Sequence, residues 1–185
     1  MITSFYSEEE IKQIGFKSIG KNVLISKKAS FYSPETISIG NNVRIDDFCI
    51  LSGEISLGSY IHISAYCALY GAYGIYMDDF TGLSPRTTIF SATDDFSGDY
   101  LIGPMIDKKY TNVIGGKVYI GKFSQIGANS VVLPNVTIEE GVAIGALSLV
   151  NKSLPAWGIY AGIPVKFIKP RNKGLLILKH KFLNE

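Results

Sequence analysis

A six-residue repeat between Val118 and Asn151 constrains the fold of this chain more than any other feature. An aliphatic residue returns at every sixth position: Ile120, Ile126, Val132, Ile138, Ile144 and Val150. A small or branched residue stands two places before each of them. Helices repeat about every 3.6 residues and strands about every two, so neither produces this period. A hexapeptide repeat is typical of a parallel β-helix, in which each hexapeptide forms one short strand and one turn.

The same repeat extends back through the N-terminal half of the chain. We call the residue at the repeated apolar position of each hexapeptide its rung. The earlier rungs are Ile19, Ile25, Phe31, Ile39, Ile45, Leu51, Leu57, Ile63, Leu69, Met77, Leu83 and Ile89. If three successive hexapeptides make one triangular coil, the coil has three faces, which we name A, B and C. Ile19 then lies on face A, Ile25 on face B and Phe31 on face C, and the order repeats in each coil. The spacing departs from six only after Phe31, Leu69 and Ile89, and these departures all fall at the C–A corner. We therefore expect about six coils, stacked about 4.8 Å apart as paired strands are.

The segments outside the repeat have recognisable signals. Ser7 and Glu10 form the pattern of a helix capping box, and Gly15 marks the end of that helix. The long loop 90–117 interrupts the repeat, and loops of this length in compact folds are usually functional. The apolar tail from Gly174 predicts a terminal helix or strand that caps the last coil. The expected organisation is one domain, 1–185, with an N-terminal helix in 1–18, a β-helix in 19–153 and a C-terminal cap in 154–185.

Composition excludes several classes of function. The net charge of +2 gives no electrostatic basis for binding nucleic acid. No signal peptide and no apolar run of membrane-spanning length is evident, so we expect a cytoplasmic protein without membrane insertion. Two histidines and no cysteine cluster argue against a metal site. Cys49 and Cys67 lie one coil apart at inward positions, so we expect stacked, buried thiols that fill the core.

Tyrosines are concentrated between Leu57 and Met77, and two interpretations of them stay open. They cover an outer face at a subunit contact, or one or two of them stack on a sugar. The residues concerned are Tyr60, Tyr66, Tyr70, Tyr73 and Tyr76.

The hexapeptides, the long loop and the ending A-G-I-P-V-K-F-I-K (161–169) together resemble the hexapeptide-repeat acyltransferases. The resemblance is greatest to the galactoside, maltose and capsular-polysaccharide O-acetyltransferases, and it covers Ile19 to Lys169. It implies an all-β fold, a left-handed parallel β-helix of hexapeptide repeats. It also implies a homotrimer with active sites between subunits, and acetyl-CoA as the acyl donor. The left-handed sense is an exception to the usual right-handed crossover.

The resemblance assigns a set of residues to the coenzyme. Ala128 and Ala146 match positions where the narrow pantetheine arm meets main-chain amides, and small side chains let it approach the backbone. Four residues near the C-terminus match the family's contacts to the phosphates, and three of them are cations suited to that charge: Asn151, Lys152, Lys166 and Lys169.

The acceptor side departs from the family pattern. Asp94 stands where the galactoside and maltose enzymes have a catalytic histidine, and the loop contains no histidine. We hypothesise that His62 is the general base, because imidazole titrates near neutral pH. The loop of a neighbouring subunit would bring Asp94 and Asp95 to the same corner, where one of these aspartates would orient or bind His62. Ser64, at an acceptor-site position, and Asp95 are the candidate substrate-binding residues. An alternative makes Asp94 the base, which would require a raised pKa.

These residues predict an acetyl-CoA-dependent O-acetyltransferase that acts on a saccharide hydroxyl in surface-polysaccharide biosynthesis. A first alternative is N-acetylation of a nucleotide-linked amino sugar, because an amine needs less help from a base than a hydroxyl does. A second is a non-catalytic β-helical scaffold. Lys152, Lys166, Ala128 and Ala146 argue against a scaffold, which would have no use for a coenzyme groove.

Overall fold

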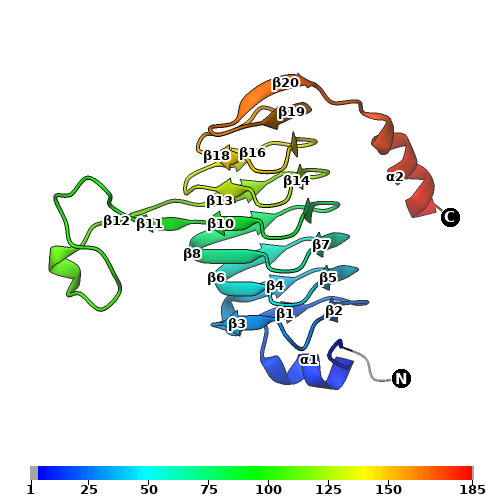
Figure 1. The fold of residues 1–185 in the computed structure, drawn as a ribbon. Coiled ribbons are helices and arrows are strands. Elements are labelled where there is room, and N and C mark those ends of the chain that lie inside the picture. The colour runs from blue at the N-terminus through cyan, green and yellow to red at the C-terminus, as the bar shows by residue number, and fades with distance from the viewer. Residues whose placement is uncertain (1–3, 185) are drawn as a thin grey trace.

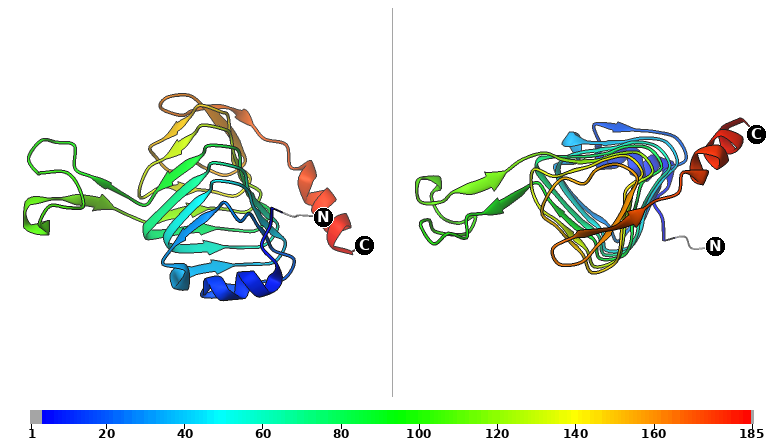
Figure 2. Two further views of the ribbon diagram at one scale, coloured as in Figure 1. Left: turned by 60° about the horizontal axis from the view of Figure 1, so that its bottom comes forward. Right: turned by 90° about the horizontal axis from the view of Figure 1, so that it is seen from above.

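The computed structural model describes residues 4–184 and shows a triangular β-helix with a projecting arm and with one helix near each end of the chain (Figures 1 and 2). The coils wind in the left-handed sense that the resemblance implied. Face B is one sheet, made of β2 (Leu24–Ile25), β5 (Val43–Ile45), β7 (Ile61–Ile63), β9 (Gly82–Leu83), β14 (Gln125–Ile126), β17 (Ala143–Ile144), β19 (Gly158–Ala161) and β20 (Lys166–Pro170).

Faces A and C form a second, continuous sheet, because β6 (Ile50–Leu57) and β8 (Ala68–Met77) run across the corner between them. On face A it holds β1 (Ser18–Ile19), β4 (Ile37–Ile39), β13 (Val118–Ile120) and β16 (Thr137–Ile138). On face C it holds β3 (Ser30–Tyr32), β10 (Thr88–Phe90), β15 (Val131–Val132) and β18 (Leu149–Val150). The short 3-10 helix η1 (Pro34–Thr36) occupies the first departure from the repeat.

The predicted register is confirmed in every coil. On face B, Ile25 pairs with Ile45, which pairs with Ile63 and so on through Leu83, Ile126 and Ile144. The first rungs of the six coils pair in the same way on face A: Ile19, Ile39, Leu57, Met77, Ile120 and Ile138. The register holds because the inward side chains are buried, and each contributes roughly 1.5–3 kcal/mol of hydrophobic stabilisation.

The two cysteines are free and buried in the core, as predicted. The Cys49 Sγ lies 3.1 Å from the Ser64 carbonyl oxygen, and the Cys67 Sγ lies 3.2 Å from that of Ser84. Each thiol therefore donates a weak hydrogen bond to the coil that follows it.

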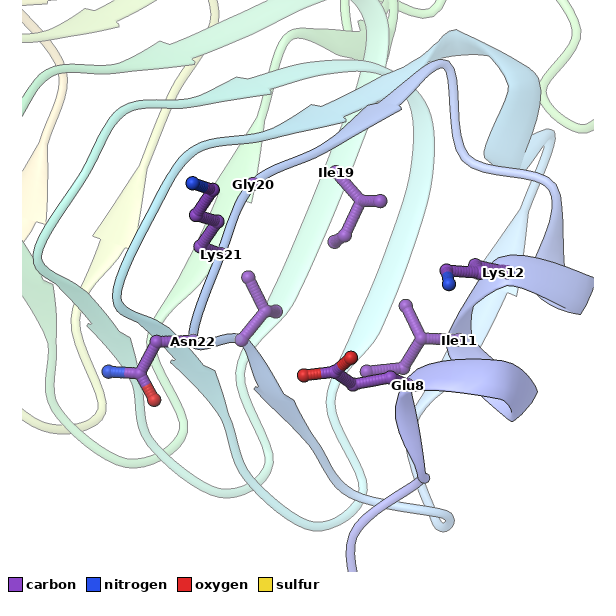
Figure 3. Close-up of a pocket in the computed structure, with 8 residues that line it drawn as sticks. Glu8, Ile11, Lys12, Ile19, Gly20, Lys21 and Asn22 are labelled. Atoms are coloured by element: carbon purple, nitrogen blue, oxygen red, sulfur yellow. The ribbon is translucent and has the colours of Figure 1, made fainter.

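Helix α1 (Glu8–Ile14) has the predicted capping box. The Ser7 Oγ accepts from the Glu10 backbone N–H, the Glu10 carboxylate accepts from the Ser7 backbone N–H, and Gly15 ends the helix at φ 84°. Only Ile11 of this helix is buried against the first coil. A pocket of about 390 Å³ remains between α1 and the coil, where Ile11 and Ile19 lie among polar side chains (Figure 3).

The position expected for the terminal cap was wrong. Helix α2 (Gly174–Asn184) does not pack over the last coil but lies along the side of the β-helix (Figures 1 and 2). Its Leu178 and Phe182 face Tyr60 and Phe80 across a groove of about 460 Å³, and the Phe182 ring meets the Tyr60 ring edge-on. The last coil is followed instead by β19, which pairs with β17 and is itself paired with β20.

The segment expected to be an irregular loop is an ordered arm that projects from the C–A corner (Figure 1). β11 (Ala92–Asp94) pairs in antiparallel fashion with β12 (Val113–Gly115), and the 3-10 helix η2 (Lys108–Tyr110) lies near the tip. Large apolar side chains of the arm are exposed, with Phe96 at 78% and Met105 at 95% of full exposure. None of the described helices has the length and apolarity needed to cross a membrane.

Candidate active site

A column of equivalent residues runs parallel to the axis at the B–C corner, where each coil leaves face B. We call it the corner column and define it as Asp46, Ser64, Ser84, Gly127 and Gly145. Backbone hydrogen bonds fix its spacing: the Ser64 N–H donates to the Leu83 carbonyl, the Ser84 N–H to Ile126 and the Gly127 N–H to Ile144. Consecutive members are thus one strand spacing apart, about 4.8 Å.

The N-terminal end of the corner column is polar. The His62 Nε2 lies 2.7 Å from the Asp46 Oδ2, and the Arg44 Nε donates to the Asp46 Oδ1 at 2.7 Å. Burial raises the pKa of Asp46, but the hydrogen bonds from His62 and Arg44 outweigh it and leave the pKa below its ordinary value. The structure therefore gives His62 an aspartate partner from its own chain, whereas the sequence predicted one from the loop.

Ser84 stands at the middle of the corner column. Its Oγ accepts from the Gln125 Nε2 at 3.2 Å, and the Gln125 side chain lies over Gly82, which has no side chain to obstruct it. Sequence reasoning named Ser64 but missed Ser84. The signal was present, because Ser84 follows the rung Leu83 as Ser64 follows the rung Ile63.

The C-terminal end of the corner column is lined by small residues. Ala128 and Ala146 follow Gly127 and Gly145, and the Ala128 carbonyl accepts from the Leu147 N–H at 2.8 Å. A Cβ placed on Gly127 would lie 2.4 Å from the Ala146 backbone nitrogen, so only glycine fits there. Ala128 is half-buried and Ala146 is exposed. A narrow ligand could therefore approach the backbone along this end.

The residues assigned to phosphate contacts do not all gather at this corner. Lys166 pairs with Ala161, at the end of β19 that points toward the B–C corner. Lys169 pairs with Ile159 farther along the hairpin, and Asn151 and Lys152 follow β18, where the chain leaves face C. One chain brings Ala128, Ala146 and Lys166 together, and places the other three elsewhere.

The two aspartates of the arm have different surroundings. Both Asp95 carboxylate oxygens accept hydrogen bonds within the arm, from the Ser97 N–H and the Asn112 Nδ2, each at 2.7 Å. These bonds, those from Ser97 first, lower the pKa of Asp95. The half-buried Asp94 carboxylate makes no hydrogen bond or ion pair within residues 4–184. Asp94 belongs to β11 in the arm, which points away from the coils (Figure 2), whereas His62 belongs to β7 on face B, so one chain does not bring the two together.

Among the described residues, no three His, Cys, Asp or Glu side chains gather closely enough to hold a metal ion. The corner column therefore offers hydroxyl, imidazole and carboxylate groups at one end and accessible backbone at the other. This set suits the transfer of a group between a polar acceptor and a narrow, extended donor.

Comparisons with known proteins agree with this arrangement. The family model of the bacterial transferase hexapeptide (six repeats) matches residues 113–152. The dTDP-4-amino-4,6-dideoxy-D-glucose acyltransferase of Escherichia coli is 46% identical over 182 residues, which cover 97% of this chain and 95% of that protein.

Solved structures of AntD, an N-acyltransferase from Bacillus cereus, are also similar. The D94A variant in complex with dTDP and coenzyme A is 58% identical with a TM-score of 0.97, over 99% of both chains. The S84A variant, in complex with dTDP-4-amino-4,6-dideoxyglucose and coenzyme A, has the same identity, coverage and TM-score.

The fold and the site define an acyltransferase built on a left-handed β-helix. The chain belongs to the hexapeptide-repeat acyltransferase family. This membership confirms the predicted family and favours an enzyme over the non-catalytic scaffold.

Proposed function

We propose that this enzyme transfers an acyl group from coenzyme A to the amino group of a dTDP-linked 4-amino-4,6-dideoxy sugar. The observation that carries the proposal is the similarity, over nearly the whole chain, to enzymes named for that acceptor. Ser84 and Asp94 add support, because the AntD variants have substitutions at a serine and an aspartate with these same numbers. N-acylation was the first alternative in the sequence analysis, and it now takes precedence over O-acetylation.

The donor would lie along the small-residue end of the corner column. Ala128 and Ala146 leave the backbone accessible to pantetheine, and Lys166 stands near enough to this corner to meet a phosphate. We propose that Asn151, Lys152 and Lys169 complete the phosphate contacts from a neighbouring copy in a homotrimer. The position of these three residues away from the corner in one chain supports a shared site.

The acceptor would lie along the polar end, with its amino group at Ser84. The nitrogen attacks the thioester carbonyl, a C–N bond forms and the C–S bond breaks. The nitrogen loses one proton and the departing thiolate takes one up, so charge and atoms balance. Ser84 and the Asp94 carboxylate of a neighbouring arm would orient the amino group by hydrogen bonds, which places the lone pair toward the carbonyl carbon. Asp95 would shape the arm, and Ser64 would contact the sugar.

O-acetylation of a saccharide hydroxyl stays the second candidate because of one observation. His62 is held by Asp46 at 2.7 Å, close to Ser64, which is the arrangement a general base for a hydroxyl would need. An amine depends less on such a base. The two functions thus make different demands on His62.

An acceptor comparison tests the proposal. We expect the purified enzyme to acylate dTDP-4-amino-4,6-dideoxyglucose, with acetyl-CoA or with 3-hydroxybutyryl-CoA, which is present in a solved AntD complex, as donor. The matched acceptor dTDP-6-deoxyglucose carries a hydroxyl at the same carbon and should not react. Thiol release gives the rate and mass spectrometry identifies the product. Transfer to the hydroxyl but not to the amine would overturn the proposal in favour of O-acetylation.

A further inference from the structure

A stack of two aromatic rings between two cations lies beside the polar end of the corner column. The Phe48 and Tyr66 rings are stacked with centroids 4.9 Å apart. The Lys28 ammonium lies 5.2 Å from the Phe48 centroid, and the Arg86 guanidinium lies 5.6 Å from the Tyr66 centroid. The four residues come from four successive coils. We call them the cation–aromatic stack.

The cation–aromatic stack is not part of the hydrophobic core. Phe48 is 46% and Tyr66 is 52% exposed. Both have left-handed backbone conformations, at φ 60° and 63°, and later coils fill the same turn position with Asn129 and Leu147. The turn therefore does not require an aromatic residue. The aromatic stack at the A–B corner, which includes Tyr60 and Phe80, lies under α2, whereas no described segment of this chain covers Phe48 and Tyr66.

The charges around the cation–aromatic stack favour an anionic ligand at one end. Lys28 pairs with Asp47 at 3.0 Å, and Asp46 is satisfied by Arg44 and His62. Arg86 makes no ion pair within the part of the chain that is described. It follows Ser84 by two residues in the same coil, so its guanidinium is the cation of the stack nearest to the proposed position of the amino sugar.

We propose that the cation–aromatic stack binds the nucleoside diphosphate of the acceptor, an inference that rests on the proposed function. With the amino sugar at Ser84, the pyrophosphate would meet Arg86 and the thymine would stack on the Tyr66 ring, which Phe48 supports from its other face. The Tyr66 ring is one coil toward the N-terminus, about 5 Å along the axis, a span that a sugar diphosphate bridges. Donor and acceptor would then approach Ser84 from opposite ends of the same corner.

The chemistry of the ligand matches the residues. A guanidinium forms paired hydrogen bonds with a phosphate, and aromatic rings stack on a nucleobase. Arg86 would leave the Tyr66 ring when it turns to the pyrophosphate, which frees that face of the ring for the base. Lys28 stays with Asp47 at the far end.

Calorimetric titration with dTDP and dTMP tests this subsite. Tyr66→Leu copies Leu147 and Arg86→Asn copies Asn129, so both variants place a residue that this turn position already accepts. We expect Tyr66→Leu to weaken the binding of both nucleotides about ten-fold, since stacking is lost. Arg86→Asn should weaken dTDP binding about ten-fold and remove the preference for dTDP over dTMP.

Matched variants provide the controls. Tyr70→Leu removes an exposed ring that stacks on Phe90 at 5.3 Å, and Lys117→Asn removes a cation 5.5 Å from the Tyr76 ring. Neither should change dTDP binding. Wild-type binding in both Tyr66→Leu and Arg86→Asn, by an enzyme that acylates the amino sugar, would overturn the subsite and leave the proposed function standing. A wild-type enzyme that neither binds dTDP nor acylates the amino sugar would overturn both.

Discussion

Asp94 and Asp95 are adjacent in the sequence and differ in what their side chains are free to do. Asp95 uses both carboxylate oxygens to hold the backbone of Ser97 and the side chain of Asn112. Asp94 has no such partner in the described chain and lies at the end of a strand, paired with Val113. A carboxylate without a partner in its own chain is the one available to a substrate or to another copy. This difference favours Asp94 over Asp95 as the proposed substrate contact.

Replacement of Asp94 and of His62 separates the two candidate reactions. Asp94→Asn keeps the shape but weakens the hydrogen bond to the amino group, so we expect kcat/KM for the amino sugar to fall about ten-fold or more. His62→Ala should change that value by less than about three-fold, because an amine needs little help from a base. Steady-state kinetics with varied acceptor measures both. A large loss in His62→Ala with Asp94→Asn unaffected would instead support His62 as an essential base.

At the scale of elements, Arg171 determines where the C-terminal segment leaves the β-helix. Its Nη1 donates to the carbonyls of Phe123 at 2.7 Å and Gly141 at 3.1 Å, two turns of successive coils. The chain then turns along the side of the coils, and α2 places Phe182 against Tyr60. A guanidinium can hold two such carbonyls at once because its donors are fixed in a plane.

Loss of the Arg171 side chain should therefore release α2. We expect Arg171→Ala to lower the free energy of unfolding by about 2 kcal/mol, since it removes charged hydrogen bonds and leaves buried carbonyls without a donor. Hydrogen exchange of α2 should become faster, while exchange in β14 and β17 stays slow. Lys173→Ala is the control, because Lys173 lies 5.1 Å from the Trp157 ring and holds no carbonyl. Unchanged protection of α2 in Arg171→Ala would contradict this role.

The elements differ in how far the sequence predicts them. The coils were predicted with their register, because buried aliphatic residues such as Ile126 and Ile144 recur at a fixed period. The start of α1 was predicted from Ser7 and Glu10. The strands of the arm were missed because Ala92–Asp94 and Val113–Gly115 are not buried, and so carry no alternating pattern.

The position of α2 could not be predicted from the sequence, because apolar residues occur on all sides of this helix. Leu175, Leu176, Ile177 and Leu178 are consecutive, so no face is marked as the one that packs. Parts of the site were missed for a related reason. Asp46 and His62 belong to neighbouring coils, and their contact depends on side-chain directions that the repeat does not specify.

At the scale of the whole molecule, one chain holds the parts of a site without bringing them together. The corner column follows face B, and the arm leaves at the C–A corner and points away from the coils (Figure 2). Exposed Phe96 and Met105 give the arm an apolar surface that no part of residues 4–184 covers. Closed symmetry among three copies would let each arm reach a neighbour's column. We therefore predict sites that are shared between copies.

Activity of mixed oligomers tests that claim most directly. Ala146→Trp should block the donor path in its own column, and Asp94→Asn should disable only the arm, so each homo-oligomer is impaired. The two variants are coexpressed with different tags, mixed oligomers are purified through both tags, and transfer to dTDP-4-amino-4,6-dideoxyglucose is measured. Every mixed trimer, whether it holds one or two copies of either variant, pairs an intact column with an intact neighbouring arm at one of its sites, which is about one third of the sites. Recovery of about one third of wild-type activity is the predicted result, and activity no higher than that of the two impaired parents would show that each chain uses its own arm.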